Sequence, residues 1–177
     1  MKTKQLTFSA MCIALIAICS WISIPFTIPF TLPTFGIFFT VRLLGGKYGS
    51  FSILAYILLG AVGLPVFSGF NCGFGALFGT TGGYITGFLP ASLIAGWRSE
   101  RRSRRLVDII YMTIALIVCY AFGTFWYSLV YVGGISSIGA ALAMCVVPYI
   151  IPDALKIALA ALMAPRLRSF LNSRHIS

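Results

Sequence analysis

Residues 106 to 131 read LVDIIYMTIALIVCYAFGTFWYSLVY and contain a single charged side chain, Asp108. A helix crosses the hydrocarbon core of a bilayer with about 20 apolar residues, so this run is long enough. Hydrophobic residues make up 59% of the 177 residues and charged residues only 9%. A soluble domain is about 45–50% apolar and about 25% charged, and a small domain cannot hide so much apolar surface in its interior. The composition therefore predicts an integral membrane protein, with the lipid bilayer as its main solvent.

The apolar segments predict an all-α fold with six transmembrane helices, forming a single transmembrane domain over residues 1–177. The first five spans are expected at 6–24, 34–45, 48–64, 80–97 and 106–131. The N-terminal run lacks the small-residue exit of a signal peptide and is expected to be retained as the first span. An unbroken helix from 138 to 166 would be about 42 Å long, against a core of about 30 Å. We therefore expect a partial helix or turn-back over 136–147 and a new helix starting near Pro152, because proline suits the first helical position.

The net charge of +10 is gathered in short clusters between the apolar segments. Basic residues occur near the N-terminus, at 42–47, at 98–105 and at 166–174, whereas the connections 25–33, 65–79 and 132–137 contain no Lys or Arg. Lys and Arg mark cytoplasmic loops, so both termini are expected in the cytoplasm of a multi-pass plasma-membrane protein. A nucleic-acid footprint would follow one face or motif instead, and no nucleic-acid partner is expected.

Two opposite charges interrupt the apolar stretch YIIPDALKIALAAL, at Asp153 and Lys156. Asp153 would lie in the first turn of the new helix, where the helix dipole favours negative charge. Ionisable residues at membrane depth are costly and usually functional, which favours a ligand contact in a cavity that opens outward. An ion pair that only locks two helices together is the structural alternative.

A glycine-rich segment, SGFNCGFGALFGTTGGYITGF, is the second unusual feature. Glycines at 75, 79, 83 and 87 recur every four residues, a spacing that in a transmembrane helix admits another backbone closely. Asn71 and Tyr84 lie among these glycines and are candidate ligand contacts, because a few convergent polar groups fix orientation in apolar pockets. The alternative is an irregular external loop with tight turns.

Several chemistries have no residues to support them in this sequence. A P-loop motif is missing, His175 is the only histidine, and the three acids are Glu100, Asp108 and Asp153. We therefore expect no enzyme activity, no metal site and no cofactor. The five cysteines lack metal or disulfide spacing and are expected to act as small packing residues.

The order of several motifs resembles the BioY family, the biotin-binding S components of energy-coupling factor (ECF) vitamin transporters. The similar stretches are PFTLPTFGIFF, GGKYGSFSILAYILLGAVGLPVF, GTTGGYITGF, AFGTFW and IPDALKIALAALMAP. The resemblance covers about residues 6–168 and implies a fold of six transmembrane helices that captures biotin from outside. It also implies a transmembrane T component and two cytoplasmic ATPase subunits as partners, and docking on the T component through small residues, which match Ala10 and Ala14.

The resemblance further implies a biotin site built from Asp153, Lys156, Tyr84 and Asn71. A carboxylate and an amide suit the two N–H donors and the carbonyl of the ureido ring. The valerate carboxylate needs a cation or several donors, and Lys156 is the first candidate, with Arg42 a second. The competing interpretations are an S component for another vitamin, and a small membrane enzyme or scaffold that binds none of these ligands.

Overall fold

The computed structural model describes residues 3–24, 30–97, 105–131 and 138–173, and in these ranges it is helical apart from one short strand pair. Strands β1 (Ser23–Ile24) and β2 (Phe30–Thr31) pair antiparallel, with Ser23 opposite Thr31. Two 3-10 turns, η1 (Ser68–Phe70) and η3 (Val147–Tyr149), lie between helices. The α-helices are α1 (Thr3–Trp21), α2 (Pro33–Leu44), α3 (Gly46–Val62), α4 (Gly73–Phe78), α5 (Gly82–Gly96), α6 (Arg105–Tyr131), α7 (Ile138–Cys145) and α8 (Ile150–Ser173).

The predicted break before the last long helix is confirmed. Helix α7 is short and ends at Cys145, and η3 separates it from α8. Helix α8 begins at Ile150, two residues before the expected start, so Pro152 lies in the first turn rather than at its first position. The first-turn N–H groups have no partner within the helix, so the proline removes no intrahelical hydrogen bond there. Asp153 is in that first turn, as expected.

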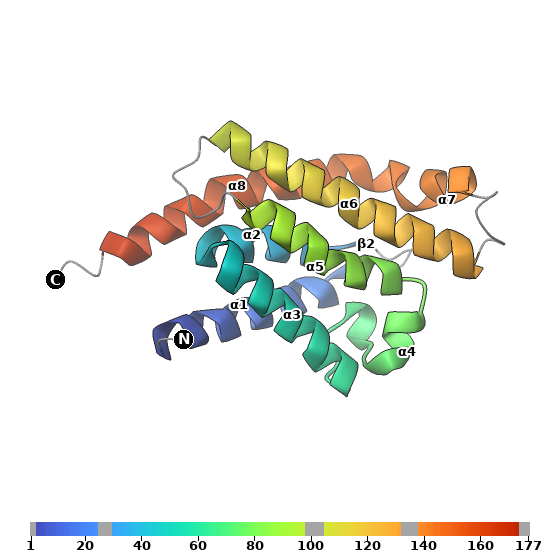
Figure 1. The fold of residues 1–177 in the computed structure, drawn as a ribbon, viewed down its shortest axis with the longest axis horizontal. Helices are drawn as coiled ribbons and strands as arrows, with labels where there is room; N and C mark the ends of the chain where they lie inside the picture. The colour runs from blue at the N-terminus through green and yellow to red at the C-terminus, as the bar shows by residue number, and fades with distance from the viewer. Residues whose placement is uncertain (1–2, 25–29, 98–104, 132–137, 174–177) are drawn as a thin grey trace.

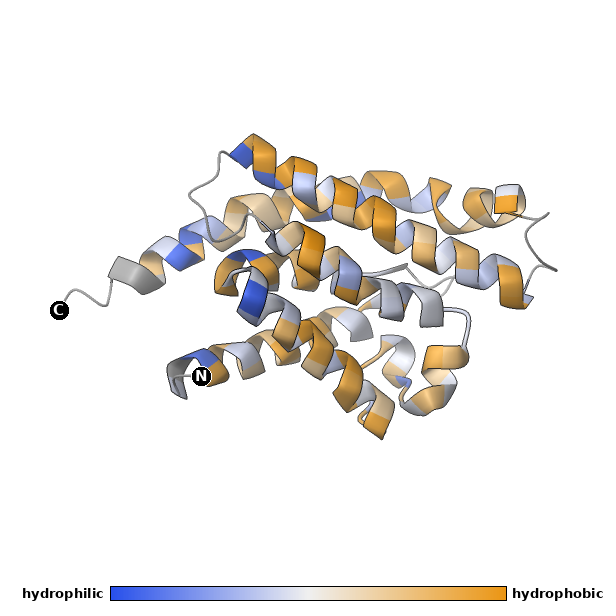
Figure 2. Ribbon diagram, in the orientation of Figure 1, coloured by the Kyte–Doolittle hydropathy of each residue, from blue (hydrophilic) through white to orange (hydrophobic). Residues whose placement is uncertain are grey.

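The helices run alongside one another and have two distinct ends (Figure 1). Helix α6 packs along α5, and α8 packs along α2. One end, here called the basic end, holds Arg42, Lys47, Arg105 and Arg166, and hydrophilic ribbon gathers there in Figure 2. Helices α4 and α7 and the β1–β2 pair lie toward the opposite end. The fully buried core between the ends includes Ile16, Ile37, Val41, Ile53 and Met112.

Large apolar side chains cover the outside of the helices, including Ile110 and Ile117 on α6 and Leu155 and Leu162 on α8. Soluble monomers rarely expose contiguous apolar surface on this scale. Two helical stretches of the described residues, Arg105–Tyr131 and Ile138–Phe170, are individually long and apolar enough to cross a membrane. The apolar stretches Gln5–Trp21, Pro33–Leu44 and Gly46–Val62 are shorter. The surface is therefore the kind that lipid covers.

The expectation that Gly75, Gly79, Gly83 and Gly87 form one helical groove is wrong. Helix α4 ends at Phe78 and α5 begins at Gly82, so the four glycines are divided between two helices and their connection. Only Gly83 and Gly87 face α6, where an added Cβ would overlap Trp126 or press on Phe122. Gly123 of α6 faces α5 in turn, and an added Cβ there would overlap the ring of Tyr84. These glycines let α5 and α6 approach closely and place Tyr84 at the helix interface.

Candidate ligand-binding site

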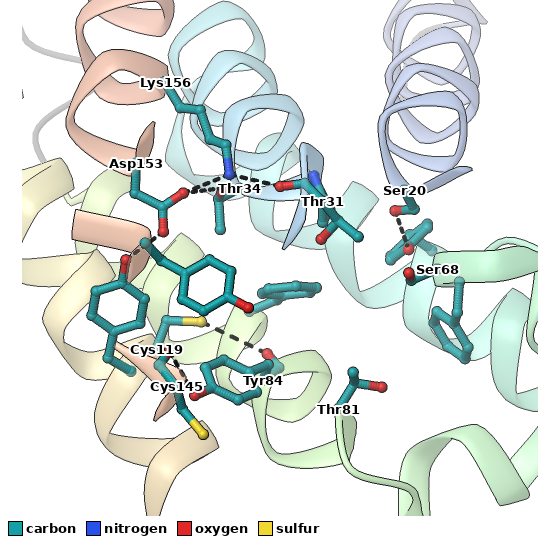
Figure 3. A pocket seen from close by; sticks show the side chains of 16 residues that line it. Ser20, Thr31, Thr34, Ser68, Thr81, Tyr84, Cys119, Cys145, Asp153 and Lys156 are labelled. Atoms are coloured by element: carbon teal, nitrogen blue, oxygen red, sulfur yellow. Dashed lines mark hydrogen bonds and ion pairs between the residues drawn. The ribbon is translucent and has the colours of Figure 1, made fainter. Parts of the chain in front are cut away.

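A pocket lies at the end of the helices opposite the basic end, where α5 and α8 begin and α1 ends (Figure 3). In Figure 3 Asp153, Lys156, Thr31 and Thr34 gather on one side, while Ser68 and Thr81 lie across the pocket. The full lining is Ser20, Thr31, Pro33, Thr34, Tyr56, Phe67, Ser68, Thr81, Tyr84, Phe88, Cys119, Tyr120, Cys145, Tyr149, Asp153 and Lys156. Apolar walls with a few converging polar groups are typical of small-molecule sites.

The two charges of the lining form a buried ion pair one helical turn apart. Lys156 Nζ lies 2.6 Å from Asp153 Oδ1, and the side chains are each 6% exposed. Lys156 Nζ also donates to the backbone carbonyl of Thr31 at 2.6 Å. This bond links α8 to strand β2 on one side of the pocket. The pairing offsets part of the desolvation cost of both charges.

Two hydroxyl groups complete the surroundings of the Asp153 carboxylate. Tyr120 of α6 donates its hydroxyl to Oδ2, and Thr34 of α2 donates to Oδ1 at 3.4 Å. Helices α2, α6 and α8 thus meet at one carboxylate. Sequence analysis missed Tyr120 and Thr34. The signal in the sequence was a tyrosine within an apolar span, since a buried tyrosine hydroxyl usually finds a partner.

Tyr84 lies in the first turns of α5 and lines the pocket as predicted. Its hydroxyl donates to the carbonyl of Cys145 at 3.4 Å. The Cys119 thiol contacts the carbonyl of Tyr84, with Sγ 3.8 Å from the oxygen. Cys119 and Cys145 therefore pack in the wall of the pocket. All five cysteines are free thiols, and four of them are buried, whereas Cys72 is exposed.

A second group of hydroxyls, which the sequence did not indicate, lies in the pocket lining. Ser20 Oγ lies 2.8 Å from Tyr56 Oη, and Tyr56 donates to the carbonyl of Val66 at 3.0 Å. Phe67 follows Val66 and packs edge-on against Tyr56, with ring centroids 5.6 Å apart. The cluster joins α1 and α3 to the loop that carries Phe67 and Ser68 into the lining.

Asn71 is not among the residues that line the pocket. Its side chain is exposed, and Nδ2 donates to the carbonyl of Ser68 at 2.8 Å. Its own carbonyl accepts a hydrogen bond from the N–H of Phe67 at 3.1 Å. Asn71 therefore closes the turn that presents Phe67 and Ser68, and the structure brings together only Tyr84, Asp153 and Lys156 of the four predicted contacts.

Ala10 and Ala14 lie on an exposed face of α1 together with Leu6, Met11 and Ile18. Ala17, one turn further on, is buried in the core and belongs to another face. The stripe of small, exposed residues on α1 that the sequence suggested therefore consists of Ala10 and Ala14. It is separate from the pocket lining.

Arg42, the second candidate for a ligand carboxylate, lies away from the pocket at the basic end. Its Nη2 forms an ion pair with Asp108 of α6, and the two side chains are 10% and 4% exposed. Its Nε and Nη1 are buried without a hydrogen-bond partner in the described chain. The pair joins α2 to α6, which is a structural arrangement.

We therefore expect Arg42→Gln to destabilise the protein without affecting the pocket. Removing one partner of a buried ion pair costs about 3–5 kcal/mol, so the detergent-solubilised variant should unfold about 10 °C below the parent. Arg166→Gln, which removes an exposed charge of α8, is the control and should unfold with the parent. Equal melting temperatures for Arg42→Gln and the parent would contradict a structural role.

The fold and site together define a helical membrane protein with a buried polar pocket at one end. Comparison with known proteins identifies the family of this membrane protein, because residues 1–173 match the model of the BioY family. This chain belongs to the BioY family, and the resemblance inferred from its motifs is confirmed.

Relatives and a solved structure agree with this assignment. The chain is 36% identical to the biotin transporter BioY of Thermotoga maritima over 166 residues, covering 93% of this chain and 96% of the relative. It is 37% identical to the probable biotin transporter BioY of Pyrococcus horikoshii over 169 residues, covering 95% and 98%. Its fold matches the 2.1 Å crystal structure of the S-component for biotin from an ECF-type ABC transporter, with a TM-score of 0.84 and 28% identity. That match covers 95% of this chain and 92% of the other. The family is one of transporters, which confirms the prediction that the chain is not an enzyme.

Proposed function

We infer that this chain is the biotin-specific S component of an ECF transporter and serves in biotin uptake. Family membership over residues 1–173 and the fold shared with a biotin S-component support this function. Within the molecule, the observation that supports this function is the Asp153–Lys156 ion pair. The pair is buried, and both of its residues line a pocket. An S component works with other ECF subunits, so uptake requires partners.

We propose that Asp153 and Lys156 hold the ureido ring of biotin. The carboxylate accepts from one ring N–H group, and the ammonium donates to the ring carbonyl beside it. A carboxylate oxygen accepts more than one hydrogen bond, so Asp153 can keep Tyr120 while it receives the ligand. This placement differs from the expectation that Lys156 pairs with the valerate carboxylate, because the charge of Lys156 is already balanced by Asp153 at 2.6 Å.

The remaining lining suits the bicyclic body of the ligand. Pro33, Phe67 and Phe88 supply apolar surface, and Tyr84 and Tyr149 add aromatic faces with polar tips. We propose that Asn71 supports this wall through its turn, by holding Phe67 and Ser68 in place. A direct contact between Asn71 and biotin would require its exposed amide to turn inward.

We propose the following arrangement in the membrane. The chain forms a single transmembrane domain over residues 1–177, with six crossings in the plasma membrane and both termini in the cytoplasm. The pocket then faces outward, because it lies opposite the basic end and Lys and Arg favour the cytoplasmic side. The subunits engaged are a T component and two cytoplasmic ATPases, and the exposed Ala10–Ala14 stripe docks on the T component.

The docking stripe is tested by Ala14→Trp, which fills an exposed position without touching the pocket. Small residues let helices approach closely, so we expect the variant to bind biotin normally but to lose most co-purification with the T component. Leu155→Trp, at an exposed position of α8, is the matched control and should co-purify normally. Undiminished assembly of Ala14→Trp would remove the stripe from the interface.

The function is tested by isothermal titration calorimetry of the purified protein in detergent. Saturable one-to-one binding of biotin, with no heat from thiamine or riboflavin, is the expected result. Binding of another vitamin instead would assign a different S component. A well-folded protein that binds none of the three would contradict the capture function.

Tyr120→Phe tests whether the tyrosine positions Asp153. Without its hydroxyl, the Oδ2 atom loses a donor, and an underused buried acceptor costs about 1–3 kcal/mol. We expect about tenfold weaker biotin binding and a lower melting temperature. Tyr111→Phe on the same helix, outside the pocket, should leave the affinity unchanged, and an unchanged affinity for Tyr120→Phe would contradict the positioning role.

A further inference from the structure

The pocket has no net charge from acidic and basic side chains. Asp153 and Lys156 are the only Asp, Glu, Lys, Arg or His in the lining that the structure describes. They lie 2.6 Å apart and are both buried. The positive charge that could hold a ligand carboxylate is therefore already balanced inside the protein.

A second carboxylate at this pair would be unfavourable. It would place two negative groups around one ammonium in a low-dielectric region, and a buried net charge is expensive. A neutral group that offers both donors and an acceptor, such as a cyclic urea, meets the pair without adding charge.

The remainder of the pocket offers hydroxyl groups but no cation. The polar side chains away from the ion pair include Ser20, Ser68, Thr81 and the tyrosines 56, 84 and 149. Ser68 and Thr81 lie across the pocket from the pair (Figure 3). The connecting segments 25–29, 65–79 and 132–137 contain no Lys, Arg or His in their sequence. Arg166, at the basic end, follows Asp153 by 13 residues along α8, about 20 Å at 1.5 Å per residue.

We propose that the pocket recognises only the neutral head of its ligand and gives the carboxylate no cationic partner, so that biotin esters and amides are ligands too. This proposal rests on the proposed function. The valerate chain points toward Ser68, Thr81 and water, where a charged and a neutral end group are both hydrated. The chain thereby captures carboxyl-modified biotins as a class, whereas changes to the ureido ring abolish recognition.

The test is a competition experiment with the purified protein, in which labelled biotin is displaced by three analogues. Biotin methyl ester and biotinamide, both neutral at the carboxyl end, are expected to bind within about tenfold of biotin. 2-Iminobiotin replaces the ring carbonyl by a protonated imine that faces Lys156, and it is expected to bind at least 100-fold more weakly.

The outcomes separate this proposal from the function on which it rests. If biotin binds but the ester and the amide bind 100-fold more weakly, the carboxylate is recognised after all, and this proposal falls while the biotin function stands. The Thr81 hydroxyl at the start of α5 would then be its first candidate partner. If folded protein does not bind biotin at all, both fall. Undiminished binding of 2-iminobiotin would overturn the assignment of the ureido ring to the Asp153–Lys156 pair.

Discussion

An Asp153→Asn variant is expected to bind biotin about 10- to 100-fold more weakly than the parent. The substitution keeps the shape of the side chain but removes the charge that accepts the ureido N–H group. Hydrogen bonds to a charged group contribute about 1.5–3 kcal/mol each, and each 1.4 kcal/mol is about tenfold in affinity. Calorimetry, or competition with labelled biotin when affinity is high, measures the change.

Two controls give this experiment its meaning. Asp108→Asn removes a buried carboxylate that is paired with Arg42 outside the pocket, and it should leave biotin affinity unchanged. A monodisperse elution profile shows that Asp153→Asn still folds. If folded Asp153→Asn binds biotin as the parent does, the carboxylate does not contact the ligand, and the pair is structural.

Lys156→Met, alone and combined with Asp153→Asn, separates the structural part of the pair from the ligand part. The single variant leaves a buried carboxylate without its ammonium, a defect of about 3–5 kcal/mol, and it should melt well below the parent. The double variant has no buried charge at this site, and replacement of a buried ion pair by neutral groups is often neutral or stabilising. We therefore expect the double variant to recover most of the melting temperature while biotin binding remains lost.

The opposite pattern would change the interpretation of the site. If the double variant regains biotin affinity along with stability, the pair acts only through the fold, by holding α8 on strand β2. If the double variant remains as unstable as Lys156→Met, the bond from Lys156 to the Thr31 carbonyl matters more than charge balance. A thermal melt and a binding isotherm on the same preparations distinguish these cases.

Local patterns in the sequence predicted most of the helices. Expected spans such as 34–45, 80–97 and 106–131 match α2, α5 and α6 to within a few residues. The short α7 and the new helix at Ile150 also agree with the length and proline argument. The spacing of the glycines at 75, 79, 83 and 87 led to a wrong prediction of one helical groove. The period of four continues across the connection between α4 and α5, where the helix is interrupted. Spacing along a chain describes one helix only while the backbone remains helical.

The lining of the pocket was predicted in part. Asp153 and Lys156 could be found because charges in an apolar helix are rare and costly, and Tyr84 because it stands among glycines at a helix start. Tyr120 and Thr34 could not be paired with Asp153, since they lie 33 and 119 residues away in the chain. Asn71 was chosen for its rarity, but its amide is used locally, on the carbonyl of Ser68.

The sequence by itself determined that this is a helical membrane protein, where most of its helices lie, which family it belongs to, and which two charges line the pocket. These properties follow from composition and from spacing within single helices, where every interaction is local. Only the tertiary structure decided which charges share a pocket, because Arg42 meets Asp108 at one end and Lys156 meets Asp153 at the other. It also decided that the cation of the pocket is already neutralised, since that depends on distances between atoms that the order of residues does not fix.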